Sequence, residues 1–193
     1  KLETNARTFS SAMPIVVISS FGGTPPDDAD LGSFMWVWEP AAPDNRSRFT
    51  NPPVIASRSV IDKRGSSTLG NPKFSLNVET RKPSDEDEQD FSLLGMPSHS
   101  DWVFHAPYAF DLSLLHNPLM YALSNSVGRY AVRNRMAEVF VDVTSAGLSF
   151  AGNASGDYFG VYNVMEKIRR GSERVDITRL DTYDNDAVRN SGG

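Results

Sequence analysis

The sequence contains no cysteine, and this absence removes several chemistries at once. Disulfides, thiolate zinc sites and cysteine nucleophiles are all excluded. Histidine is also scarce, because His99, His105 and His116 are the only ones in the chain. No pair of them has the i, i+4 spacing of a helical zinc site. We therefore expect no zinc centre.

The sequence also lacks a surplus of basic residues and any long apolar run. Its net charge is -5 at pH 7, and Lys and Arg cluster only in short stretches, which argues against a nucleic-acid partner. No run approaches the roughly 18 apolar residues of a membrane span, so we expect none. Residues 1–11 lack the apolar centre of a signal peptide. The missing initiator Met and the Ser-Gly-Gly ending lead us to expect a trimmed or processed fragment.

What the chain does contain is typical of a soluble globular protein. It has 193 residues, of which 39% are hydrophobic, 22% charged and 10% aromatic. This composition predicts one compact domain with a substantial core.

Strand-like patterns dominate the sequence. Phe74, Leu76 and Val78 alternate with polar residues, which is typical of a half-buried strand. The run at 158–165 is apolar on both faces, which predicts a central strand. In total, β-branched, aromatic or alternating residues predict strands at residues 14–19, 34–38, 54–61, 73–80, 101–106, 136–143 and 158–165.

One helix is predicted clearly, over residues 117–128. Asn117 can cap it, Pro118 suits its first turn, and apolar residues follow at helical spacing up to a terminating glycine. Many strands with one main helix predict an α+β fold built on an antiparallel or mixed sheet.

Other stretches predict loops. Residues 81–90 contain five acids, and a solvated loop explains them. A calcium loop is the alternative, but Asp90 stands where an EF-hand needs its turn glycine. We assign residues 1–12 to an N-terminal extension and residues 178–193 to a polar tail.

Trp36, Trp38 and Trp102 lie in predicted strands. Tryptophans in strands belong to the core more often than to a binding surface. They could alternatively line a sugar-binding face.

Four stretches in register resemble the CotH family, the atypical protein kinases named after a spore-coat protein. They are KRGSSTLGNPKFS at 63–75, LLGMPSHSDWVFHAPY at 93–108, NPLMYALSNSVGRYA at 117–131, and the segments EVF, GVYNVMEKI and RGSERVDI within 138–177. The resemblance covers roughly residues 13–177, which we take as an incomplete CotH-like domain resembling a minimal kinase-like N-terminal portion.

This resemblance implies a function. Family members transfer the γ-phosphate of ATP to protein hydroxyls with Mg²⁺, and many are secreted, periplasmic or on cell surfaces. The chain would then supply the nucleotide-side portion, with a protein substrate or a surface-assembly partner. The alternative is a non-catalytic extracellular assembly or binding module on the same fold.

The residues matching the family motifs suggest where a nucleotide would bind. Lys73 opens a strand where a kinase-like lobe places its phosphate-contacting lysine, although a surface lysine at a strand end is an equally good interpretation. Arg64, Ser66 and Ser67 offer a guanidinium, hydroxyls and backbone N–H groups suited to phosphate, although a polar turn would use the same residues. Glu166 ends the predicted central strand where a kinase hinge would meet adenine, and it could equally be a plain strand-end acid.

The sequence departs from the family pattern in two ways. His116 stands where many members have arginine, which makes any basic role there pH-dependent. The catalytic and metal-binding aspartates of the family lie in a C-terminal portion, and no matching motif occurs here. We therefore expect no catalytic or metal-ligating residue in this chain, no activity from it alone, and a need for the missing C-terminal portion of the same protein.

Overall fold

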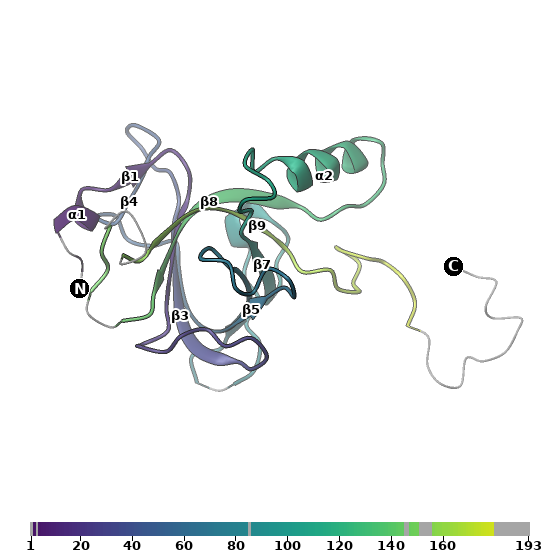
Figure 1. Ribbon diagram of the computed structural model, residues 1–193. Coiled ribbons are helices and arrows are strands. Elements are labelled where there is room, and N and C mark those ends of the chain that lie inside the picture. Colours follow the sequence, from purple (N-terminus) through teal and green to yellow (C-terminus); the bar gives the residue numbers. More distant parts are fainter. Residues whose placement is uncertain (1, 3, 85, 145–146, 151–155, 180–193) are drawn as a thin grey trace, which may run out of the picture.

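The computed structural model describes residues 2, 4–84, 86–144, 147–150 and 156–179. Its dominant feature is a closed barrel of seven strands, with a small two-stranded sheet and a helix outside it (Figure 1). The elements are α1 Thr4–Arg7, β1 Ser10–Ser11, β2 Ile15–Ser19, β3 Leu31–Trp38, β4 Ser47–Arg48, β5 Ile55–Arg64, β6 Ser75–Arg81, the 3₁₀ turn η1 Leu93–Gly95, β7 Asp101–His105, α2 His116–Ser126, β8 Asn134–Asp142 and β9 Tyr158–Glu166.

All seven predicted strands are present, as is the predicted helix. The predicted fold class is wrong, however, because the described residues form a mostly β structure rather than a kinase-like α+β fold. The order around the barrel is β2-β3-β5-β6-β7-β9-β8, and a parallel pair between β2 and β8 closes it. Local sequence patterns reveal the strands but not this pairing, because it joins residues far apart in the chain. Ser19 and Asp142, for example, are 123 residues apart.

The barrel interior is filled by the alternating inward residues of the strands. Met35 and Val37 of β3 face Leu76 and Val78 of β6 across one continuous cluster, as expected for period-2 strands. The β6–β7 connection also enters this core, since Leu93, Leu94 and Met96 belong to the same cluster. The barrel is therefore a packed core rather than a channel.

The connection that supplies these apolar residues begins with the acids that predict a solvated loop. Glu86 pairs with Arg58 at 2.5 Å, and Asp87 pairs with Lys82 at 3.1 Å. Both acids are exposed, so the solvated-loop prediction is confirmed for the part of the segment that the structure describes.

A second apolar cluster lies on the outside of the barrel, over β2 and β8. It contains Ile15, Val17 and Phe140, covered by Phe9 and by Phe49 from the loops. Phe9 and Phe140 meet edge to face with centroids 5.4 Å apart, a favoured aromatic geometry. Burial on both faces explains why β2 is apolar from Ile15 to Ile18.

Helix α2 lies beside the barrel and buries none of its residues fully (Figure 1). Its cap differs from the prediction, because the helix begins at His116 and the Asn117 side chain faces His105 instead. The Asp111 carboxylate accepts a hydrogen bond from the His116 backbone N–H at 3.1 Å. The C-terminal end of α2 follows the prediction, with Gly128 at φ 78 after the last turn.

The segment assigned to an N-terminal extension, residues 1–12, contains α1 and β1 in the part that the structure describes. The predicted polar tail, 178–193, falls outside the described residues apart from Thr178 and Arg179. Within the described residues, no helix has the length and apolar character needed to cross a membrane.

Candidate functional site

The β5–β6 hairpin forms the wall of a small pocket at one end of the barrel. The pocket has a volume of about 120 Å³, and its lining residues are Arg64, Gly65, Thr68, Lys73, Ser75, His105, Ala106 and Phe110. A space of this size suits one phosphate group better than a whole nucleotide, since small-molecule sites usually have about 300–1,000 Å³.

Gly65 allows the hairpin to turn into this pocket. Its φ is +140, a value that side chains rarely adopt, and a Cβ placed there would overlap Oγ1 of Thr68. The chain therefore brings a backbone without a side chain close to Thr68, directly after Arg64. Such bare backbone at a turn is a common way to approach an anion.

Lys73 is half-buried at the mouth of the barrel. Its Nζ donates a hydrogen bond to the Val161 carbonyl of β9 at 2.5 Å and lies 4.9 Å from the centre of the Tyr162 ring. Tyr162 in turn donates to the Phe74 carbonyl at 2.8 Å, which ties the start of β6 to β9. The ammonium is thus held in one place by a carbonyl and an aromatic face.

Burial lowers the pKa of Lys73, while the nearby Glu138 carboxylate acts in the opposite direction. Glu138 is itself buried and accepts hydrogen bonds from Ser11 at 2.8 Å and from Tyr158 at 2.6 Å. Because desolvation disfavours the charged lysine, an approaching anion would stabilise the ammonium more than it would a solvated one.

Arg64 is exposed and extends along the same rim. Its guanidinium donates to the Asn77 side chain at 3.3 Å, and the Asn77 amide donates to Asp62 at 2.8 Å. Arg64 pairs with Ser75 across the hairpin, which explains why Arg64 and Lys73 meet at one pocket.

His105 completes the far wall of the pocket. Burial lowers its pKa, with Arg64 and Lys73 adding to the effect and Asp111 opposing it. Its Nε2 lies 3.3 Å from the Asn117 amide, so a neutral ring can accept that hydrogen bond. The site therefore carries its positive charge on Arg64 and Lys73.

The structure brings together only some of the residues predicted from the sequence. Arg64 and Lys73 line the same pocket, whereas Ser66 and Ser67 are exposed in the hairpin turn and do not line it. Sequence reasoning missed Thr68, His105 and Phe110. No local sequence signal places His105 beside Lys73, because their proximity follows from the pairing of β6 with β7, which sets the end of β7 next to the start of β6.

Glu166 lies at the opposite end of β9, five residues and roughly 16 Å beyond Val161. It is completely buried and forms an ion pair with Arg133 at 2.8 Å and a longer one with Arg174 at 3.9 Å. Tyr130 donates to the same carboxylate at 3.2 Å. The backbone N–H of Glu166 donates to the Arg133 carbonyl at 3.1 Å.

A comparison with known families identifies a match that covers most of the chain. The family model described as CotH kinase protein matches residues 61–190, a range that contains the pocket and all five residues predicted to contact nucleotide. None of the curated proteins matches the chain.

Proposed function

The chain belongs to the CotH kinase protein family, and on that basis we propose that it forms the nucleotide-side portion of a kinase that transfers the γ-phosphate of ATP to protein serine or threonine. The observation that carries the proposal is the convergence of Arg64 and Lys73 on one small pocket beside the bare backbone of Gly65. Phosphoryl transfer depends mostly on positioning and on stabilising charge. Cations held in fixed places supply both.

Lys73 is the central residue of the proposed site. An ammonium has three N–H donors, and one of them is used on the Val161 carbonyl. Lys73 lines the pocket, so its remaining N–H groups would donate hydrogen bonds to the oxygens of a phosphate bound there. Arg64 adds a guanidinium from the exposed rim, which suits a terminal phosphate.

The other predicted residues take supporting roles in this proposal. Ser66 and Ser67 lie in the turn that follows Gly65, where their hydroxyls could meet a larger ligand extending out of the pocket. Glu166 anchors the far end of β9 through Arg133, and in this arrangement its contribution is to hold the strand rather than to contact phosphate.

ATP and Mg²⁺ differ in how well they fit the residues of this chain. The pocket fits a phosphate group, because cations and backbone line it. No carboxylate is among its lining residues. Elsewhere in the structure, Glu79 and Glu88 lie close to Asp101. Asp101 already forms ion pairs with Lys167 and Arg169. The described residues therefore offer Mg²⁺ no ligands at the pocket, and we assign no step to the metal.

A second function has one observation in its favour. Large apolar side chains are exposed along α2, among them Leu119, Met120 and Leu123, which are between 52% and 62% accessible. Exposed apolar patches often mark protein-binding surfaces. A non-catalytic assembly module at a cell surface would use such a patch and would not need the pocket.

Calorimetric titration with ATP and with inorganic triphosphate distinguishes the two functions. We expect both ligands to bind the chain and Lys73→Ala to weaken them about tenfold or more, as expected for loss of a charge-assisted hydrogen bond. Lys82→Ala removes an exposed cation outside the pocket and should change neither affinity. Absence of binding, or equal binding by the Lys73→Ala variant, would overturn the kinase proposal and favour the assembly module.

A further inference from the structure

A second, larger pocket lies on the outer face of the barrel, over β2, β3 and β8. Its volume is about 380 Å³, which is in the usual range for small-molecule sites. It shares no lining residue with the pocket around Lys73. Whatever it binds is therefore separate from the proposed phosphate site.

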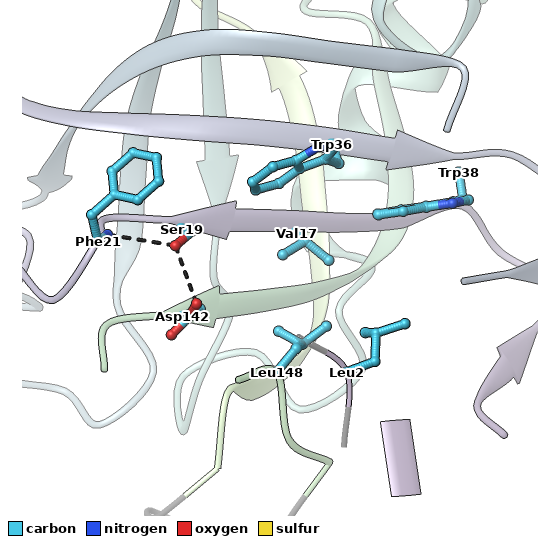
Figure 2. A pocket seen from close by; sticks show the side chains of 8 residues that line it. All are labelled: Leu2, Val17, Ser19, Phe21, Trp36, Trp38, Asp142 and Leu148. Atoms are coloured by element: carbon cyan, nitrogen blue, oxygen red, sulfur yellow. Dashed lines mark hydrogen bonds between the residues drawn. The ribbon is translucent and has the colours of Figure 1, made fainter. Parts of the chain in front are cut away.

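Two indoles form one side of this pocket. Trp36 and Trp38 are alternate residues of β3, so both project from the same outer face (Figure 2). Trp38 is fixed by a hydrogen bond from its Nε1 to the Asn51 carbonyl at 2.8 Å, and Trp36 lies against Phe34 with centroids 4.5 Å apart. Of the three strand tryptophans, Trp102 is fully buried in the central core, whereas Trp36 and Trp38 are half-buried and pack against the outer apolar cluster.

Aliphatic residues form the floor and the opposite side. Val17 of β2 lies directly across from Trp36 in the sheet, and Figure 2 shows Leu148 and Leu2 on the other side of Val17 from the two indoles. The body of the pocket is therefore apolar, with aromatic faces along one wall.

The polar groups gather at one end. Ser19 pairs with Asp142 across the parallel strands, and its hydroxyl donates to the Asp142 carboxylate at 3.1 Å (Figure 2). The same hydroxyl accepts a long hydrogen bond from the Phe21 N–H at 3.5 Å. The Thr144 N–H donates to the other carboxylate oxygen at 3.1 Å. This end of the pocket thus presents a carboxylate in a fixed orientation.

The residues that line the pocket favour a ligand of positive charge as well as a particular shape. Asp142 is the only ionisable residue among the described residues that line the pocket, and it is an acid in a chain of net charge -5. The Ser19 hydroxyl has its donor committed to Asp142, so this pair presents acceptors to a ligand. A sugar would need both donors and acceptors around its ring, whereas a cation with methyl or methylene groups needs only aromatic faces and one carboxylate.

We propose that the pocket formed by Trp36, Trp38, Val17 and Asp142 binds a small organic cation with a methylated or alkylated ammonium group. The methyl groups would lie against the indoles and Val17, and the positive charge would face Asp142. The site is independent of the phosphate pocket and would be present whether or not the protein transfers phosphate.

Choline and its neutral isostere 3,3-dimethylbutan-1-ol test the proposal. The two have the same shape but only choline carries charge, and saturation transfer from the protein to their methyl protons can be measured for weak binding. We expect choline to bind at least about tenfold more tightly than the alcohol, as expected for a cation–π contact combined with a carboxylate. Equal binding of the two, or no binding of choline, would overturn the proposal.

Variants show whether binding occurs at this pocket. Asp142→Asn and Trp36→Leu should each weaken choline binding about tenfold, whereas Trp36→Phe, which keeps an aromatic face, should lose only about threefold. Asp176→Asn and Tyr108→Leu are matched changes of exposed residues outside the pocket and should have no effect. Lys73→Ala should also leave choline binding unchanged. N-acetylglucosamine binding that depends on the same residues, with choline bound no more tightly than its neutral isostere, would identify a sugar site and overturn the cation assignment.

Discussion

At the scale of single residues, Gly65 shows how tightly the candidate phosphate site depends on its backbone. The turn needs a positive φ at Gly65. It also places the Thr68 side chain in the space that a Cβ on residue 65 would occupy. Both constraints act at once, so no other residue type fits without moving the hairpin that carries Arg64 and Lys73.

We predict that Gly65→Ala lowers the free energy of unfolding by about 1–2 kcal/mol, because alanine disfavours this φ and overlaps Thr68. Urea denaturation measures the change. Gly70→Ala, in the same turn but with open space around it, should stay within about 0.5 kcal/mol. Adding Thr68→Ala to Gly65→Ala should recover part of the loss, and equal stability of the two glycine variants would contradict the explanation.

The side-chain contacts of the site could be predicted only in part. The motif at 63–75 placed Arg64 and Lys73 close together because a hairpin joins them. His105 comes from another strand, and its approach depends on how β7 pairs with β6, which no local pattern specifies. The Asp111 carboxylate that caps α2 was also missed. It lies five residues before His116 and reaches the helix across a turn, rather than from the usual N-cap position.

At the scale of elements, the end of β9 is the point where three segments are joined. Glu166 connects β9 to the segment before β8 through Arg133 and to the chain after β9 through Arg174. Arg174 also donates to the Asp101 carbonyl at 3.1 Å and the Lys167 carbonyl at 2.6 Å. Burial, followed by the Glu166 charge, raises the pKa of Tyr130 to about 12, so its hydroxyl stays protonated and continues to donate to the carboxylate.

Removing this carboxylate leaves the buried Arg174 without its main counter-charge. We expect Glu166→Ala to lower the free energy of unfolding by about 3 kcal/mol, since breaking a buried ion pair from one side is costly. Chemical denaturation with Glu173→Ala as the control tests this, because Glu173 is an exposed acid nearby and its removal should cost less than about 0.5 kcal/mol. Similar losses in the two variants would show that the buried ion pair contributes little.

At the scale of the whole molecule, closure of the barrel extends the folded unit beyond the region that the family match covers. The match begins at residue 61, yet β2, β3 and the first part of β5 precede it. Their inward residues Val16, Ile18, Met35 and Val37 belong to the central core. Each strand was recognisable from its own residues, but the sequence pattern could not reveal that β2 closes the sheet against β8.

We therefore predict that a fragment of residues 55–193 does not fold. It would lose four central core residues and expose unpaired edges on β5 and β8, a state prone to association. A fragment of residues 9–193 keeps every barrel strand and should fold. Dispersion of amide proton NMR signals distinguishes the outcomes, and a well-dispersed spectrum from the 55–193 fragment would show that the barrel need not be closed.

The shallow seating of α2 has a further consequence for the molecule. The helix has 11 residues and none of them is fully buried, whereas isolated helices shorter than about 12–15 residues are marginal in water. Its order must then come from the Asp111 cap, from the turn at Gly128 and from Tyr121 against Val103 and Met165. We therefore expect α2 to unfold locally at a lower free-energy cost than the barrel strands, so that loss of one of these contacts would affect the helix without disturbing the barrel.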